Sequence, residues 1–501
     1  METQKKIIVT SKKNLQAKYG AEFATVDKLL ENLVSADKKR NIDTQVVYID
    51  SPASAKKVGV KSVASITLQS TKKAIDDIYK KNLPAYLVIF GSKDIIPFQE
   101  LKNIIPNNDR DTVIPSDLPY ACDAPYSNNI SSFTGPTRVV GRIPDITGQA
   151  DLKYLETVIN TIIQWKPLKQ ERYMNYFSVS ASVWTKSTQQ SLIYVFTNSA
   201  KLKNSPTATI SYPAKELQPL VHFYNCHGSP IDSKYYGQKG NSYPIAMEST
   251  DLKDKISFGT IVAAECCYGA ELFDPANEDF RHLSIANTYF ANKAIAFVGS
   301  STIAYGPAEG QGLADIITKF FIKNVLSGAS TGRAFLEARQ QFLDDSGTLD
   351  PFEMKTLAQF YLLGDPSIHP VTKEETESGE ESVENHRLKL MTKGISLSKT
   401  IGVSELVENR QSKTNKFSNG WSDIMKQTGF SGNEDEFLFE VKSKSKRSSD
   451  FAKEITGGDN VSFRTFIQKA KPDHDKLCLF DVLVLKESGD KLLGWKMYQS
   501  K

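Results

Sequence analysis

Short apolar runs alternate with longer amphipathic stretches from the start of the chain to about residue 370. The short runs have the length and character of buried strands, and the stretches between them repeat apolar residues at helical spacing. Strands are predicted over residues 6–10, 45–49 and 86–90, and helices over residues 26–36 and 70–80. Buried strands that are separated by helices are typical of a parallel sheet with helices on its faces.

A strongly amphipathic helix is predicted over residues 152–165, and a second alternating series follows it. The predicted strands of this series are residues 176–181, 220–225, 260–264 and 294–298, and its predicted helices are residues 188–198, 313–326 and 332–343. We therefore predict an α/β fold with doubly wound parallel sheets in two subdomains, residues 1–165 and 166–372.

The pattern changes after Pro370. Residues 373–384, KEETESGEESVE, contain six acidic residues and a single large aliphatic residue, which predicts a solvated linker over residues 373–385. Beyond it the chain is more basic and richer in strand-like runs, so residues 386–501 are predicted to form a small C-terminal α+β domain. Its predicted strands are residues 436–441, 463–467, 477–485 and 492–497.

Charge and cysteine content narrow the class of protein. Lys and Arg number 62 and Asp and Glu 58, so the net charge of +4 is too small to indicate nucleic acid or an anionic membrane as a partner. Five cysteines in 501 residues are too few for a disulfide framework, and an odd number cannot all pair, which favours free thiols in a reducing compartment. The first apolar run, residues 7–9, is too short for a signal peptide, and no window approaches the roughly 20 apolar residues of a membrane span. We expect a soluble, intracellular, cytoplasmic protein.

Two of the predicted strands end in residues with reactive side chains. Residues 221–229 read VHFYNCHGS, and residues 261–269 read IVAAECCYG. His227 and Cys267 are 40 residues apart, which is enough for one crossover between parallel strands. Since the carboxyl ends of neighbouring parallel strands meet at one crevice, His227 and a cysteine are predicted to face each other there.

A histidine beside a thiol can generate a nucleophile, because it takes the thiol proton and later gives a proton to the leaving amine. Backbone N–H groups at Gly228 and at the cysteine are candidates to hold an oxyanion. Other interpretations remain open: a structural histidine, inert buried thiols, or a zinc site of Cys226, His227 and the two following cysteines. Adjacent ligands are poor spacing for zinc, so we predict no metal and no other cofactor.

Six short segments in order extend the pattern: AYLVIFGSKDIIPF at 85–98, Ser116-Asp117 with Tyr120, RVVGR at 138–142, NCHGS at 225–229, AIAFVGSS at 294–301 and LLGDPS at 362–367. Together with the acid-x-Cys-x-Gly strand end, this series resembles the gingipain-type family of cysteine peptidases, in the clan with the caspase fold. The resemblance covers about residues 85–370. It implies caspase-like, doubly wound parallel sheets in the two predicted subdomains, and hydrolysis of peptide bonds by a Cys-His dyad.

The resemblance leaves two choices for the nucleophile. An ungapped comparison with gingipains favours Cys266. The pattern of the wider clan puts an acid or Gln two residues before the nucleophile, and Glu265 in that place favours Cys267. We predict Cys267, with Cys266 as the alternative.

This chain departs from the family at two places. Val183-Trp184 stands where gingipains carry an acid that orients the histidine, and residues 186–191, KSTQQS, stand where they carry the acid that selects a basic P1 side chain. Specificity for Arg or Lys therefore cannot be carried over from the resemblance.

The resulting hypothesis is an intracellular cysteine endopeptidase. His227 is the general acid and base, Cys267 the nucleophile, and the N–H groups of Gly228 and of the cysteine hold the oxyanion. Residues expected to line the substrate cleft are Tyr268, Ser300, Ser301 and Tyr305. The expected partners are a protein substrate and a regulatory partner bound by the C-terminal domain.

Two rival hypotheses remain. One is a catalytically degenerate caspase-fold scaffold or interaction protein, which the missing acids favour. The other places the peptidase in a regulated bacterial defence or cell-death response.

Overall fold

The computed structural model describes most of the 501-residue chain. The described residues are 3–105, 109–204, 211–307, 309–372, 383–401, 404–409, 421–432, 434–443, 461–470, 476–489 and 491–501. Of the predicted linker, residues 373–385, residues 373–382 lie outside the described residues.

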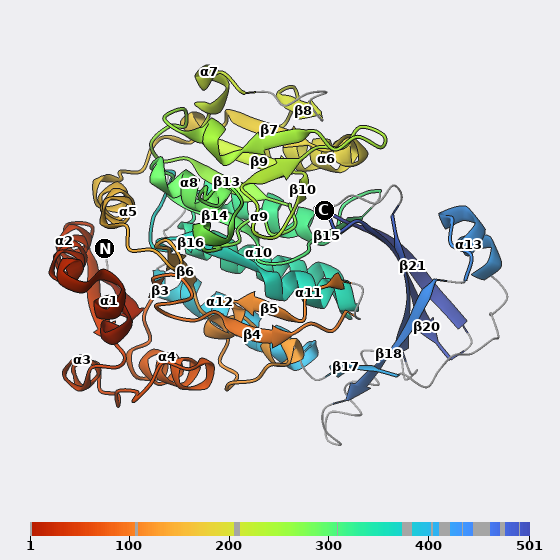
Figure 1. Ribbon diagram of the computed structural model, residues 1–501. Helices are drawn as coiled ribbons and strands as arrows, with labels where there is room; N and C mark the ends of the chain where they lie inside the picture. Colours follow the sequence, from red (N-terminus) through yellow and green to blue (C-terminus); the bar gives the residue numbers. More distant parts are fainter. Residues whose placement is uncertain are drawn as a thin grey trace.

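One 10-stranded sheet forms the centre of the molecule, in the order β2-β1-β3-β6-β16-β14-β13-β9-β7-β8 (Figure 1). Its strands are β1 (Gln4–Thr10), β2 (Ile42–Tyr48), β3 (Tyr86–Phe90), β6 (Val140–Ile143), β7 (Tyr176–Ser180), β8 (Leu202–Asn204), β9 (Val221–Asn225), β13 (Ile261–Ala264), β14 (Ala296–Ser300) and β16 (Phe360–Gly364). Neighbouring strands are parallel throughout this sheet except at β14 and β16, which pair antiparallel. The expected α/β class with a mostly parallel sheet is confirmed. In place of separate sheets in two subdomains there is one sheet, because β16 pairs with β6 of the first series and with β14 of the second.

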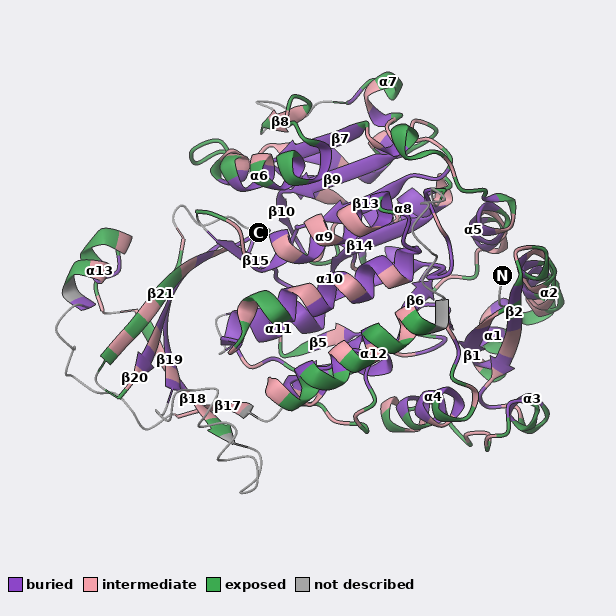
Figure 2. Ribbon diagram, turned by 180° about the vertical axis from the view of Figure 1, so that it is seen from behind, coloured by how far each residue is buried: buried purple, intermediate pink, exposed green. Residues whose placement is uncertain are grey.

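Helices cover both faces of the sheet. The contacts α6–α9 and α9–α10 place those helices on one face, where Figure 2 shows them side by side, and the contacts α2–α5 and α5–α8 place a second layer opposite. The helices of this part are α1 (Lys12–Tyr19), α2 (Phe23–Lys39), α3 (Pro52–Lys57), α4 (Leu68–Asn82), α5 (Leu152–Gln164), α6 (Thr185–Phe196), α7 (Ala214–Leu217), α8 (Ile285–Ala291), α9 (Ala314–Leu326), α10 (Thr331–Ser346) and α11 (Pro351–Gln359). β3, β7, β9, β13, β14 and β16 are buried along their whole length, as expected for strands covered on both faces.

Several segments of the family resemblance hold the sheet together through buried ion pairs. Arg142 on β6 donates to both oxygens of Asp117, at 2.9 and 2.6 Å. Asp365, just after β16, accepts from Lys6 on β1 at 2.7 Å. Because these pairs join separate segments of the chain, the Ser-Asp, Gly-Arg and Gly-Asp-Pro-Ser residues of the resemblance have an architectural role here.

Smaller elements surround the sheet. β10 (His227–Gly228), β11 (Lys234–Tyr236) and β12 (Ile245–Glu248) form a three-stranded sheet directly after β9, and β4 (Gln99–Lys102) pairs with β5 (Val113–Ser116). Among the residues that the structure describes, no helix is both long enough and apolar enough to cross a membrane.

The C-terminal region begins with helix α12 (Val383–Thr400), which packs on α10. Its strands form an antiparallel sheet in the order β15-β21-β20-β19-β18-β17. The elements are β17 (Ser404–Glu408), α13 (Trp421–Thr428), β18 (Asp435–Ser443), β19 (Val461–Lys469), β20 (Phe480–Ser488) and β21 (Lys491–Ser500). β15 (Tyr305–Pro307) belongs to the preceding part of the chain, so this sheet extends into it (Figure 1).

Candidate active site

His227 and Cys267 lie after two neighbouring strands. β9 and β13 pair in parallel, with Val221 opposite Ile261 and Tyr224 opposite Ala264. A Cβ atom built on Gly228 would lie 1.8 Å from the Cys267 carbonyl oxygen. The backbone after His227 therefore runs directly against the backbone of Cys267, in an approach that only glycine permits. The structure brings the two predicted strand ends together.

A neutral amide, that of Gln238, contacts the imidazole of His227. Its Oε1 lies 2.8 Å from Nε2 of His227, and its own Nε2 donates to the Gly240 carbonyl at 3.3 Å. Because a carbonyl can only accept, the amide nitrogen faces Gly240 and the oxygen faces the histidine. Nε2 of the imidazole then carries the proton, which leaves Nδ1 as the basic nitrogen.

Trp184 occupies the place of the missing acid. Its ring packs on the imidazole with 4.6 Å between ring centroids. Sequence reasoning identified that the acid is missing, but it did not identify Gln238 as a residue that contacts the histidine. Gln238 lies in a loop 11 residues after His227 and belongs to no motif.

The two adjacent cysteines have different surroundings. The Cys267 thiol contacts the Ala304 main chain: it donates to the carbonyl at 3.4 Å and accepts from the N–H at 3.3 Å. The Cys266 thiol lies beside the Cys226 thiol, which itself donates to the Val179 carbonyl on β7. Burial raises the pKa of both Cys266 and Cys267 above the ordinary thiol value.

The four expected cleft residues fall into two pairs. Ser300 donates to the Cys266 carbonyl at 2.7 Å, and the Ser301 N–H donates to the Gln359 carbonyl at 3.0 Å. Ser300 thus supports the backbone at the cysteines, whereas Ser301 ties the end of β14 to the end of α11. The other pair is Tyr268 and Tyr305, and the main chain of Tyr305 pairs with Ser500 of β21.

A buried charged cluster positions both tyrosines. Lys355 donates to Asp109 at 2.5 Å and to Asp111 at 2.9 Å. The Tyr305 hydroxyl donates to Asp109 at 3.2 Å and the Tyr268 hydroxyl to Asp111 at 2.8 Å. Burial, only partly opposed by Lys355, raises the pKa of Asp109 to about 7. The cluster joins segments more than 200 residues apart, so no local pattern predicts it.

Lys501 lies in the same site. Its N–H donates to the Ala304 carbonyl at 2.8 Å, and its carbonyl oxygen accepts from the Cys267 N–H at 3.1 Å. Its Nζ is 2.7 Å from Glu265 Oε2 and 2.9 Å from Asp315 Oδ1, and all three side chains are fully buried. The ammonium also lies 5.4 Å from the centre of the Trp184 ring. Sequence reasoning missed Asp315 and Lys501 altogether.

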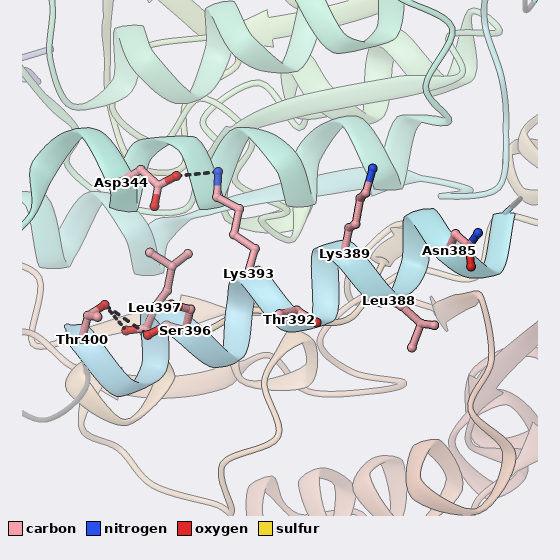
Figure 3. A pocket seen from close by; sticks show the side chains of 9 residues that line it. All are labelled: Asp344, Asn385, Leu388, Lys389, Thr392, Lys393, Ser396, Leu397 and Thr400. Carbon is pink, nitrogen blue, oxygen red and sulfur yellow. Dashed lines mark hydrogen bonds and ion pairs between the residues drawn. The ribbon is translucent and has the colours of Figure 1, made fainter. Parts of the chain in front are cut away.

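Two observations bear on other kinds of site. Within the described ranges, no group of three or more His, Cys, Asp or Glu side chains is placed to hold a metal ion. A surface hollow lies between α10 and α12, where Lys393 pairs with Asp344 and where Leu388, Lys389 and Leu397 contribute to the wall (Figure 3). It contains neither His227 nor a cysteine, so it is separate from the candidate site.

Of three comparisons with known proteins, the match to a family model agrees with the chemistry of this site. A family model described as Peptidase family C25 matches residues 2–371. A search among curated proteins finds no match. A solved structure titled "Structure of Protease" is 12% identical, with 100% of this chain and 98% of that chain covered and a TM-score of 0.49. That likeness is too weak to support an inference.

Proposed function

The chain belongs to peptidase family C25, and on that premise we propose that it is a cysteine endopeptidase with His227 and Cys267 as its catalytic dyad. Family membership confirms the resemblance to gingipain-type enzymes and makes the chain a cysteine-type peptidase acting on peptide or protein substrates. The dyad, its roles and its setting are proposals.

One observation carries the assignment of Cys267. Its backbone N–H donates to the main-chain oxygen of Lys501 at 3.1 Å. A nucleophile whose own N–H holds the substrate carbonyl is the arrangement that acyl transfer requires, because the same donor then stabilises the oxyanion. Cys266 faces Cys226 instead, so its thiol points away from that carbonyl.

The proposed reaction follows from these positions. Nδ1 of His227, made basic by the Nε2–Gln238 hydrogen bond, takes the Cys267 proton, and the thiolate attacks the scissile carbonyl carbon. The Cys267 N–H, joined by that of Gly228, holds the oxyanion. His227 protonates the leaving amine, and water then hydrolyses the thioester with His227 as the base.

The test compares the two cysteines as a matched pair. We expect Cys267→Ala to lower hydrolysis of a positional-scanning peptide library by about 10³-fold or more, by analogy with other nucleophile knockouts. Cys266→Ala, the control, should stay within about tenfold of wild type, and EDTA should leave the rate unchanged. An inactive Cys266→Ala beside an active Cys267→Ala would reverse the assignment.

A wild-type protein that hydrolyses no member of the library, even after activation, would instead support the catalytically degenerate scaffold.

The cellular setting is a further part of the proposal. All five cysteines are free and buried, which supports an intracellular, cytoplasmic peptidase. Regulated proteolysis in bacterial defence or cell death is the context we propose. Maleimide labelling of the thiols in intact cells, with and without a permeant reagent, tests the location.

A further inference from the structure

The last strand of the chain lies where a peptide substrate would lie. β21 pairs antiparallel with β15, with Tyr305 opposite Ser500, Gly306 opposite Gln499 and Pro307 opposite Tyr498. β15 begins directly after Ala304, the residue that contacts the Cys267 thiol. Addition of an extended strand to an exposed strand is a common mode of peptide recognition, in which the main chain provides affinity and side-chain pockets provide specificity. Figure 1 shows the end of β21 between β10 and β15.

The backbone of Lys501 is held from both sides, as at a P1 position. Its N–H donates to Ala304 and its carbonyl accepts from the Cys267 N–H. The first contact continues the strand pairing, and the second puts the Lys501 carbonyl in the oxyanion site of the proposed reaction. The residue before it, Ser500, is anchored to its own sheet, since its hydroxyl donates to the Cys478 carbonyl at 2.7 Å.

The side chain of Lys501 fills a buried, acidic pocket. A Cβ atom on Gly306 would lie 2.0 Å from Cε of Lys501, so the glycine makes room for the aliphatic stem. The ammonium ends between Glu265 and Asp315, with the Trp184 ring beside it. An unpaired ammonium this deep in the protein would be strongly unfavourable, so the pocket fits a primary amine closely.

The charge state of the pocket also suits a single cation. Burial, and then the neighbouring Asp315, raise the pKa of Glu265 well above its usual value. Burial acts on Asp315 in the same direction, but the Lys501 ammonium and the hydrogen bond with Glu265 outweigh it and lower the pKa of Asp315. One carboxylate therefore faces one ammonium, and the Glu265 carboxyl adds a hydrogen bond.

We propose that residues 491–501 are an internal, substrate-like occupant of this active site, with Lys501 in the P1 pocket formed by Glu265, Asp315, Gly306 and Trp184. This inference rests on the proposed function. The C-terminal sheet keeps the groove closed to other peptides, and withdrawal of β21 opens it to substrates with lysine at P1. Arginine is disfavoured, because Nζ of lysine already reaches both carboxyl groups and a guanidinium needs more length and a flat, forked site.

The rest of the C-terminal region strengthens this closure by tethering the strand. Tyr498 donates to Asp350 at 2.8 Å, Lys496 pairs with Glu353 at 2.6 Å, and Ser229, beside the catalytic histidine, donates to the Lys476 carbonyl at 2.8 Å. A tethered ligand competes at an effective concentration on the order of millimolar, so a free peptide at micromolar concentration is excluded.

The closing experiment first removes the lysine side chain without deleting the strand, so that β21 loses its contacts with Glu265 and Asp315 and is more easily displaced by a peptide. Lys501→Ala should raise kcat/KM for a fluorogenic peptide with lysine at P1 at least tenfold. Lys491→Ala is the matched control, because Lys491 is an exposed lysine at the far end of the same strand and its loss should change nothing.

In the Lys501→Ala background, Glu265→Gln and Asp315→Asn should each lower the lysine-to-glutamine preference at P1 by tenfold or more. Thermal unfolding of each variant shows that it is folded.

A binding measurement separates failure of this inference from failure of the proposed function. In a Cys267→Ala background, where no hydrolysis occurs, a fluorescent Tyr-Gln-Ser-Lys peptide should bind when Lys501 is alanine and should not bind when Lys501 is intact. Equal binding in both, or equal peptidase activity of wild type and Lys501→Ala, would overturn the internal occupant. If the peptide binds selectively but the Lys501→Ala protein hydrolyses no peptide, the lysine pocket is supported and the proposed peptidase function is contradicted.

Discussion

At the scale of single residues, the site depends on buried polar groups, and most of their partners come from distant segments. His227 relies on Gln238, Lys355 on two aspartates, and Lys501 on Glu265 and Asp315. The sequence pattern identifies His227 and the cysteine pair because each ends an apolar strand. It does not identify Asp315, which sits on an ordinary helix, since a pairing across 186 residues leaves no local trace.

Glu271 shows how burial near the site changes stability with pH. Burial raises the pKa of Glu271 from 4.5 to about 7, although the Ile231 N–H donates to it at 2.8 Å. The folded protein thus holds this proton more tightly than the unfolded chain, so the free energy of unfolding falls as pH rises from 4.5 to 7.

Glu271→Gln, which keeps an acceptor for Ile231, should remove that dependence. The variant should gain about 1–2 kcal/mol over wild type at pH 7 and nothing below pH 4.5, the gain being limited by partial solvent exposure. Urea unfolding across this range measures the difference. A constant difference at every pH would show that Glu271 titrates normally.

At the scale of elements, the strands and helices that were predicted within the first 370 residues agree with the structure to within a few residues, whereas α1, α3, α8 and α11 were not predicted. β3 coincides with the predicted residues 86–90, and β9 and β13 lack only the first predicted residue of each. β16 was identified as a motif but not as a strand, and α12 was not predicted at all. The antiparallel place of β16 could not be foreseen, because alternation of strand and helix carries no information about strand order.

Gly228→Ala tests the close contact between the ends of β9 and β13. The added methyl group would overlap the Cys267 carbonyl, so the two strand ends must separate. We expect hydrolysis to fall by about 10²-fold or more, since catalysis is sensitive to displacements of about 1 Å. Gly312→Ala is the control, because its nearest new contact is an ordinary 3.6 Å to Pro307. Unchanged activity in Gly228→Ala would show that the ends can move apart freely.

At the scale of the whole molecule, the boundary drawn at residue 372 remains a prediction. The family match ends at residue 371, and the acidic stretch that follows lies largely outside the described residues. The C-terminal region nevertheless returns to the peptidase part through α12 and β21. Composition alone can separate the two parts, but it cannot show that the second part re-enters the site of the first.

Residues 1–372 are expected to fold alone, and limited proteolysis of the full chain should cut first between residues 373 and 387. If the C-terminal region restrains the site, the 1–372 fragment should show higher basal peptidase activity than the full chain. If the 1–372 fragment is insoluble and the full chain has no protease-sensitive site between residues 373 and 387, the C-terminal region is part of the core and the boundary is wrong.

The pairing of β21 with both β15 and β20 has a consequence for an opened enzyme. Withdrawal of β21 leaves two rows of unsatisfied backbone N–H and C=O groups, one along β15 and one along β20. Such open edges are templates for association with other chains. A bound substrate pairs with the backbone groups of β15 but leaves those of β20 unpaired. The activated form is therefore the aggregation-prone form of this protein, and its lifetime in solution depends on what covers β20 while the groove is in use.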